Sequence, residues 1–157
     1  MQLEAGHHMA DENVAFNDGA AYERFMGRWS RAVAGIFLDW AAPPADACWL
    51  DVGCGTGAFS EMIVRSGAAK GVVAIDPAQE QIEYARRLPI AQAVDFKVAD
   101  AVNLPFADRS FDVVASALVI NFIPDRMRAL AEMRRVARPA GLVIGYVWDF
   151  ANERSSG

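Results

Sequence analysis

Three glycines, Gly53, Gly55 and Gly57, alternate with other residues directly after a short apolar run at 48–52, and this spacing constrains the fold of the chain most strongly. A glycine has no Cβ atom, so its backbone can take a positive φ and can lie against a ligand. In open parallel sheets, ligands bind at the carboxyl ends of the strands, where such turns lead into a helix whose first amide groups face the ligand. The spacing therefore predicts an α/β fold with a ligand site at this turn.

Strand and helix patterns alternate along most of the remaining chain. Apolar residues at three- and four-residue steps predict a helix between residues 20 and 40, which Pro43 and Pro44 end. Short apolar runs predict strands at 48–52, 71–75, 94–98, 111–117 and 142–148, and the intervening segments predict helices at 59–66, 78–88 and 125–137. This order is typical of a Rossmann-like parallel sheet with right-handed crossovers and helices on both faces.

The 157 residues fit one folded domain, which we place at residues 20–150. Residues 1–19 show little periodicity and contain His7 and His8, so we interpret them as a flexible tail or a vector-derived remnant. Residues 151–157 are interpreted as a polar tail. No strand pattern follows residue 148.

Composition argues against several classes of protein. The net charge is −5, and no nucleic-acid partner is expected because phosphate binding needs clustered positive charge. The arginines that do cluster have helical spacing, which favours a solvated helix face over a binding patch (Arg126, Arg128, Arg134, Arg135 and Arg138). No apolar run reaches the ~18 residues of a membrane helix, and no signal-peptide pattern is visible, so no membrane partner is expected. Cys48 and Cys54 are too few for a zinc or disulfide framework, which predicts a cytoplasmic protein without a metal site.

Asp76 follows the second predicted strand, at the point where a carboxylate can accept both hydroxyls of a ribose. Charged hydrogen bonds of this kind contribute about 1.5–3 kcal/mol each. The alternative is an ordinary turn carboxylate before Pro77. Together with the glycine turn, Asp76 indicates a ligand that contains adenosine.

Asp100 follows the third predicted strand, and its carboxylate is placed to accept the exocyclic amine of adenine. The Ala101 amide would then face a ring nitrogen. The alternative is that Asp100 caps the segment that follows it. Leu104 and Phe106 either close over the adenine or belong to the core.

The run at 49–57, Trp-Leu-Asp-Val-Gly-Cys-Gly-Thr-Gly, resembles the first motif of class I S-adenosylmethionine-dependent methyltransferases. Asp76, Asp100, the strand at 111–114 and the run Arg-Val-Ala-Arg-Pro-Ala-Gly at 135–141 follow in that family's order and spacing. The similarity is closest to the small-molecule branch called type 11, which is related to ubiquinone/menaquinone-biosynthesis enzymes, and it extends from Tyr22 to about Trp148.

The resemblance implies contacts with each part of S-adenosylmethionine. The glycine turn would hold the methionine part, the acid after the second strand the ribose, and the acid after the third strand the adenine. The residues implied are Asp51, Gly53, Cys54, Gly55, Gly57, Asp76, Pro77, Asp100 and Ala101.

A lid over the cofactor is also implied, on the helix that precedes the sheet. Tyr22, Arg28 and Trp29 would lie near the carboxylate or the sulfonium, where an aromatic face beside a cation contributes about 0.5–2 kcal/mol. The alternative places Trp29 in the core and Arg28 on the surface.

The activity that the resemblance implies is methyl transfer to a small-molecule acceptor. The sulfonium already activates the methyl group, so the protein mainly supplies alignment and no catalytic residue can be named. Three features depart from the family: Ala140 stands where a second glycine is common, Asn121 stands where His is common, and the antiparallel strand pair after the fifth strand is missing. We therefore expect a chain that is truncated after its fifth strand.

Two other functions stay open. One is a cofactor-binding fragment without activity of its own, or a homodimer that pairs through the exposed edge of the fifth strand, because proteins usually cover such an edge. The other is an NAD-dependent oxidoreductase, because Gly53, Gly55 and Ala58 also fit the dinucleotide pattern G-x-G-x-x-A. The oxidoreductase interpretation is less consistent with three residues, Asp51, Gly57 and Asp100.

Overall fold

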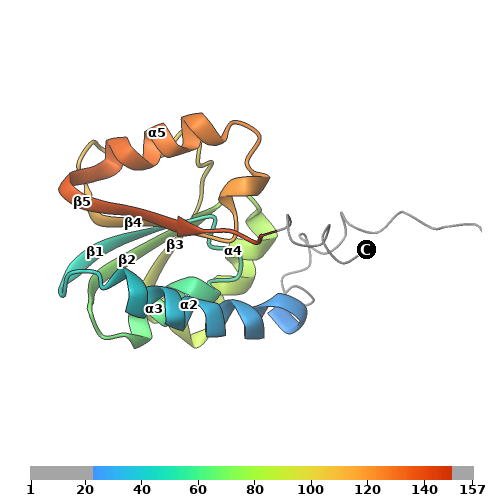
Figure 1. Ribbon diagram of the computed structural model, residues 1–157. Helices are drawn as coiled ribbons and strands as arrows, with labels where there is room; N and C mark the ends of the chain where they lie inside the picture. Colours follow the sequence, from blue (N-terminus) through green and yellow to red (C-terminus); the bar gives the residue numbers. More distant parts are fainter. Residues whose placement is uncertain (1–22, 150–157) are drawn as a thin grey trace, which may run out of the picture.

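A computed structural model describes residues 23–149 (Figure 1). The helices are α2 (Arg28–Ala41), α3 (Ala58–Arg65), α4 (Gln79–Arg86) and α5 (Arg126–Val136), with shorter turns η1 (Glu23–Gly27), η2 (Pro89–Gln92) and η3 (Ile120–Phe122). The strands are β1 (Ala47–Val52), β2 (Ala69–Asp76), β3 (Val94–Val98), β4 (Phe111–Ala117) and β5 (Ala137–Tyr146). Within the described range, no helix combines the length and the hydrophobicity that crossing a membrane requires.

The five strands form one parallel sheet in the order β3-β2-β1-β4-β5. The chain leaves β1 toward β2 and β3 on one side, and then returns to β4 and β5 on the other side. The strand order therefore reverses between β1 and β4, and an open α/β sheet binds its ligand at such a reversal, outside the carboxyl ends of the strands. The predicted Rossmann-like α/β fold is confirmed.

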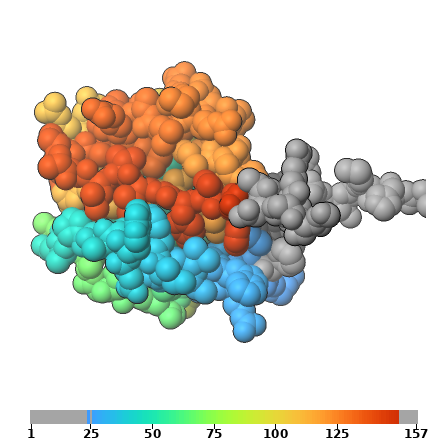
Figure 2. Space-filling model, in the orientation of Figure 1, coloured from blue at the N-terminus to red at the C-terminus, as the bar shows by residue number. Residues whose placement is uncertain are grey.

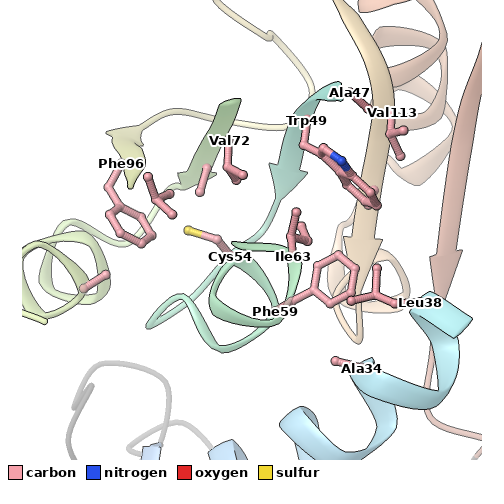
Figure 3. Packing of buried hydrophobic residues seen from close by; sticks show 14 of the residues in the cluster. Ala34, Leu38, Ala47, Trp49, Cys54, Phe59, Ile63, Val72, Phe96 and Val113 are labelled. Carbon is pink, nitrogen blue, oxygen red and sulfur yellow. The ribbon is translucent and has the colours of Figure 1, made fainter. Parts of the chain in front are cut away.

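Helices cover both faces of the sheet (Figure 1). On one face, α2, α3 and α4 pack against the sheet in a core that includes Trp49, Phe59 and Ile63 (Figure 3). On the other face, α5 packs with the connection between β3 and β4 around Leu50, Val114 and other residues of a second core. Strand β1 lies between the two cores, which explains why it is almost continuously apolar.

The fifth strand begins earlier than its sequence predicts. We expected a turn at 138–141 and a strand at 142–148, whereas β5 starts at Ala137 directly after α5. The register shifts between Phe111↔Ala137 and Val113↔Leu142, and Ala140 has φ 62° within this irregular part. Pro and Gly therefore mark a bulge inside an edge strand, where a missing N–H is tolerated, and not a loop before the strand.

The edge of β5 lies at the surface between α5 and the helices of the opposite face. Figure 2 shows β5 between the orange α5 above it and the blue and cyan helices below it. Val143 is 40% exposed and Val147, just after the strand, is 46% exposed. This side of the sheet carries no further strand among residues 23–149.

Candidate functional site

The glycine turn is tied to the end of the neighbouring strand β2. The amides of Gly53 and Cys54 both donate to the carbonyl oxygen of Ile75, each at 2.8 Å. The Gly57 amide donates to the Cys54 carbonyl oxygen at 2.8 Å and closes the turn. The turn is therefore held in one shape at the carboxyl edge of the sheet, where the strand order reverses.

Two of the glycines are required by packing as well as by backbone conformation. Gly53 has φ 78°, and a Cβ atom there would lie 2.5 Å from Cγ1 of Val119. Gly57 has φ 88°, and a Cβ atom there would lie 2.8 Å from Cζ of Phe96. Gly55 also has a positive φ, 53°. An L side chain at these positions would be strained, so the spacing of the glycines follows from the shape of the turn.

Asp76 links the end of β2 to the glycine turn and to the start of α4. Its Oδ2 accepts the Gly55 amide at 3.0 Å, and its Oδ1 accepts the Ala78 amide at 2.9 Å. Pro77 lies between them on the surface. A carboxylate has about four acceptor positions, so Asp76 retains capacity for two ribose hydroxyls after these two bonds. Asp76 is thus a turn carboxylate and remains available as a ligand acceptor.

Asp51 is a buried carboxyl group at the end of β1. It is 0% exposed, and its Oδ2 accepts the hydroxyl of Ser60 on α3 at 2.6 Å. Its Oδ1 is also buried and has no hydrogen-bond partner among the described residues. A buried acceptor without a donor is costly, so an unfilled oxygen here indicates a place for a donor or a cation that the described chain does not itself supply.

Burial changes the acid–base behaviour of both carboxyl groups. Loss of solvation raises the pKa of Asp51 from 3.8 to about 7; the Ser60 hydroxyl opposes this shift and the charge of Asp76 adds to it. Burial also raises the pKa of Asp76, while the amides of Ala78 and Gly55 oppose the rise. A positive charge placed beside either carboxyl group would lower its pKa again, whereas a negative charge would raise it further, so the pair favours a cationic ligand over an anionic one.

Cys54 contributes its backbone to the turn and its side chain to the core. The residue is 7% exposed, and Figure 3 shows its sulfur directed toward the core near Phe96. Burial, the largest cause, raises the pKa of its thiol, and the charges of Asp51 and Asp76 raise it further. A neutral, buried thiol is unreactive, so the part of Cys54 that a ligand would meet is its main chain.

Asp100 caps the turn that follows β3. Its Oδ1 accepts the Val102 amide at 3.0 Å, as the alternative interpretation expected, and its side chain is exposed. Ala101 is buried in the second core. Leu104 is 3% exposed in that core, and Phe106 packs edge-on against Phe111, so both belong to the core.

The two described residues of the expected lid lie at the start of α2. Arg28 is exposed and Trp29 is 65% exposed, so the alternative that buries Trp29 in the core is wrong. Tyr22 lies outside the described residues. The described structure shows two surface side chains in this segment and leaves their role a prediction.

Sequence patterns missed two residues that shape the site. Ser60 and Val119 were not singled out, although one bonds Asp51 and the other packs against Gly53. Asn121, which the sequence did single out, follows β4, and its buried Oδ1 has no hydrogen-bond partner among the described residues. A hydroxyl three residues after Gly57, on the first turn of the helix, was the available signal for Ser60. Val119 offered none, because its role depends on how β4 lies beside β1.

The interpretation of the arginines as a solvated helix face is wrong for Arg135. Arg138 is exposed as expected, but it lies on β5 and not on the helix, and it donates to Asp112 at 2.7 Å. Arg135 is half-buried and donates to four groups of the β3–β4 connection and of its own helix. Arg126, Arg128 and Arg134 are exposed. Arg135 has the same helical spacing as the exposed arginines of α5, so the spacing alone did not distinguish the anchored side chain from the solvated ones.

The edge of the sheet combines the groups that a nucleoside with a cationic tail needs. Asp76 offers a carboxylate beside the glycine turn, and Asp51, two residues before that turn, has a buried Oδ1 without a hydrogen-bond partner among the described residues. Asp100 lies after the neighbouring strand β3. These donors and acceptors fit S-adenosylmethionine, which has a ribose, an adenine, an ammonium and a sulfonium.

Comparison with known proteins points to the same family as the sequence motif. A protein-family model described as "Methyltransferase domain" matches residues 50–145, more than half of the chain. The biotin biosynthesis bifunctional protein BioHC of Cellvibrio japonicus is 36% identical over 128 residues, which are 81% of this chain and 25% of that protein. The ubiquinone/menaquinone biosynthesis C-methyltransferase UbiE of Dinoroseobacter shibae is 33% identical over 133 residues, 82% of this chain and 53% of that protein.

Solved structures share the fold. A SAM-dependent methyltransferase from Aquifex aeolicus superimposes with a TM-score of 0.74 at 21% identity, covering 89% of this chain and 77% of that one. The partner of the Trm112 methyltransferase activator in a Haloferax volcanii complex superimposes with a TM-score of 0.76 at 22% identity, covering 88% of this chain and 62% of that one. The chain spans from a quarter to about half of the length of the two curated relatives.

Proposed function

This chain belongs to the methyltransferase-domain family of class I S-adenosylmethionine-dependent methyltransferases, and we propose that it binds S-adenosylmethionine at the carboxyl ends of β1, β2 and β3 and transfers the methyl group to a small-molecule acceptor. The observation that carries the proposal is the junction of Asp76 with the glycine turn. The carboxylate at the end of β2 accepts the amide of Gly55, and so fixes the turn that follows β1, the strand beside which the strand order reverses.

The proposed cofactor contacts, except that of Tyr22, involve residues that the structure describes. The main chain at Gly53, Cys54, Gly55 and Gly57 lies against the methionine part, and a positively charged group of the ligand would favour the ionised form of the buried Asp51 carboxyl. Asp76, with Pro77 beside it, accepts the ribose hydroxyls. Asp100 and Ala101 meet the adenine, and Arg28 and Trp29, with Tyr22 before them, close the site.

When bound, the cofactor supplies a methyl group on a positively charged sulfur, which is activated for in-line displacement. The residues of the chain bind and orient it. Backbone hydrogen bonds hold the turn between β1 and α3 without a ligand, which reduces the conformational freedom that binding has to remove. Alignment of this kind accounts for effective molarities on the order of 10⁵–10⁸ M, and no side chain has to exchange a proton unless the acceptor requires it.

The acceptor is proposed at the level of a class. The name of one relative specifies a quinone-biosynthesis C-methyltransferase, and a relative from Serratia marcescens, 38% identical over 95 residues that are 36% of its length, is a malonyl-[acyl-carrier protein] O-methyltransferase. A demethylated quinone and a malonyl thioester are therefore the first acceptors to test. A chain that binds the cofactor and transfers to no acceptor would match the alternative of a binding domain without turnover.

The exposed edge of β5 supports a homodimer. The edge strand at the other end of the sheet, β3, is shorter and carries Asp95 and Lys97, charges that discourage pairing. Strand β5 has ten residues and an exposed Val143. A two-fold axis would pair it with its own copy in antiparallel orientation.

A cytoplasmic location is part of the same proposal. Its support is that both thiols, Cys48 and Cys54, are free. Reduced cysteines are usual in the cytosol.

The test of the proposed activity is a radiolabel assay with S-adenosyl-[methyl-³H]methionine and the two acceptor classes. Label in either product, lost in Asp76→Asn, supports the proposal. Binding of the cofactor without label in any product favours the binding-domain alternative, and absence of binding refutes both.

A further inference from the structure

Helix α5 holds the connection between β3 and β4 through one row of side chains. Arg128, Glu132 and Arg135 are spaced by four and three residues, so they lie on one face of the helix. Each of the three makes a hydrogen bond to the main chain of residues 102–106. We call these three residues the α5 clamp.

The contacts follow the connection in order. Arg128 Nε donates to the carbonyl oxygen of Val102 at 2.9 Å. The Leu104 amide donates to Glu132 Oε2 at 2.8 Å. Arg135 then donates through Nη2 to the Leu104 carbonyl oxygen at 3.0 Å and through Nη1 to the Phe106 carbonyl oxygen at 2.8 Å.

Residues of the α5 clamp also bind one another. Arg135 binds both oxygens of Glu132, at 2.8 and 2.9 Å, and reaches Asp108 at 2.8 Å. The Arg135 hydrogen bond is the largest cause that lowers the pKa of Glu132, so this carboxylate stays ionised near neutral pH. A forked guanidinium with several acceptors holds its position better than a single contact would.

The clamped connection begins at the residues that the proposed function assigns to adenine. Asp100 accepts the Val102 amide, and Arg128 holds the carbonyl oxygen of the same Val102. Leu104, two residues further, is bonded through both its amide and its carbonyl. The backbone after Asp100 is therefore positioned by α5, from the opposite face of the sheet to α3 and α4.

We propose that Glu132 and Arg135 are positioning residues for adenine recognition: they hold the connection so that Asp100 and Ala101 meet the base, and they thereby determine selectivity for adenine over other bases. This inference rests on the proposed function. Neither residue has to touch the cofactor.

The experiment compares two ligands that differ at positions 1 and 6 of the base. S-adenosylhomocysteine has an amine at position 6, which can donate to Asp100, and an unprotonated N1, which can accept the Ala101 amide. S-inosylhomocysteine has a carbonyl at position 6, which donates nothing to Asp100, and an N1–H, which cannot accept an amide. The wild-type protein should prefer the adenine compound by about tenfold or more, the effect expected of one hydrogen bond to a charged group. The variants are Arg135→Ala, Arg135→Lys, which keeps the charge but loses the fork, and Glu132→Gln.

The control is Arg134→Ala, on the same helix turn, because Arg134 is exposed and outside the clamp. We expect the Kd ratio of the two ligands to fall toward one in Arg135→Ala, to fall partly in Arg135→Lys and Glu132→Gln, and to keep its wild-type value in Arg134→Ala. A purely structural role would weaken both ligands by the same factor and would leave the ratio unchanged.

Hydrogen exchange on the unliganded protein provides a second test, because it measures how firmly the connection between β3 and β4 is held. The amides of residues 101–104 and of Phe106 should exchange faster in the Arg135 variants and at the wild-type rate in Arg134→Ala. If Arg135→Ala does not fold, the Kd ratios of Arg135→Lys and Glu132→Gln test the proposal instead. An unchanged Kd ratio in folded clamp variants overturns the proposal while the proposed function stands, whereas a wild-type protein that binds neither ligand refutes both.

Discussion

The carboxylate of Asp76 accepts the amide of Gly55 at 3.0 Å, and this bond joins the end of β2 to the turn that follows β1. A second bond, from the Ala78 amide, fixes the orientation of the carboxylate. The side chain that we assign to the ribose is thus also the side chain that shapes the methionine site. Loss of this group should therefore affect the two halves of the ligand together.

The substitution Asp76→Asn tests this double role. An amide nitrogen in place of one oxygen would face a backbone N–H, either of Gly55 or of Ala78, and would accept no ribose hydroxyl. We expect the affinity for S-adenosylhomocysteine to fall by about 10–100-fold, from the loss of charged hydrogen bonds of roughly 1.5–3 kcal/mol each. Titration calorimetry measures it, with Asp95→Asn, an exposed acid on β3, as the matched control. Equal affinities in Asp76→Asn and the wild type would contradict the assignment.

A second prediction concerns the packing of the glycine turn. In Gly57→Ala, the new methyl group would lie 2.8 Å from Phe96, at a φ of 88° that L residues rarely adopt. We expect the free energy of unfolding to drop by about 1–3 kcal/mol. The control Gly71→Ala places a methyl group where no atom lies within 4 Å, and should change stability by no more than about 0.5 kcal/mol. Urea denaturation compares the two, and equal losses would show that the turn tolerates a side chain.

The third prediction is a dependence of stability on pH that Asp51 causes. The folded protein keeps the Asp51 proton up to a pH of about 7, because burial raises its pKa, whereas the unfolded chain loses it near 3.8. Between these values the unfolded chain binds fewer protons, so the contribution of Asp51 to stability is complete below about pH 4 and is lost as the pH rises toward 7.

The measurement is the free energy of unfolding across this window for the wild type and for Asp51→Asn. The difference, wild type minus variant, should decrease with rising pH by a few kcal/mol and then level off above pH 7. Other groups, such as Asp112 and Glu132 with their lowered pKa values, contribute equally to both proteins and cancel. A constant difference would mean that Asp51 is ionised throughout, with an ordinary pKa.

The fourth prediction concerns association through β5. Sedimentation equilibrium should detect a dimer at high protein concentration, and Val143→Lys should weaken it, because a charged side chain on an edge strand disfavours pairing. The control is Val98→Lys, since Val98 is 48% exposed on β3 at the opposite edge of the sheet. A wild-type protein that stays monomeric at all concentrations would rule out this dimer.

The strands and helices were accessible from the sequence because their signals are local. The glycine spacing, the buried strand at 111–117 and the acids after β2 and β3 each depend on a few neighbouring residues. The start of β5 could not be predicted from the sequence. Pro139 and Gly141 indicate an interruption of regular structure, which can be a loop before the strand or a bulge within it, and only the pairing with β4 distinguishes the two.

The sequence predicted the main residues of the site but few of the residues that position them. Asp51, Asp76 and the glycines follow from the motif, whereas the partners that position them come from other parts of the chain. Ser60 reaches Asp51 from α3, Val119 reaches Gly53 from the segment after β4, and Arg135 reaches the β3–β4 connection from α5. The contacts of Val119 and Arg135 depend on the packing of whole elements, and no spacing in the sequence encodes them; only Ser60, three residues after Gly57, had a local signal.

The most direct test of the central claim is a calorimetric titration of the purified chain with S-adenosylhomocysteine and, separately, with NADH. We expect saturable one-to-one binding of S-adenosylhomocysteine and none of NADH, because the glycine turn, Asp51 and Asp76 fit the nucleoside with an amino-acid tail. Binding of NADH without binding of S-adenosylhomocysteine would contradict the claim and would identify the glycine turn as a dinucleotide site.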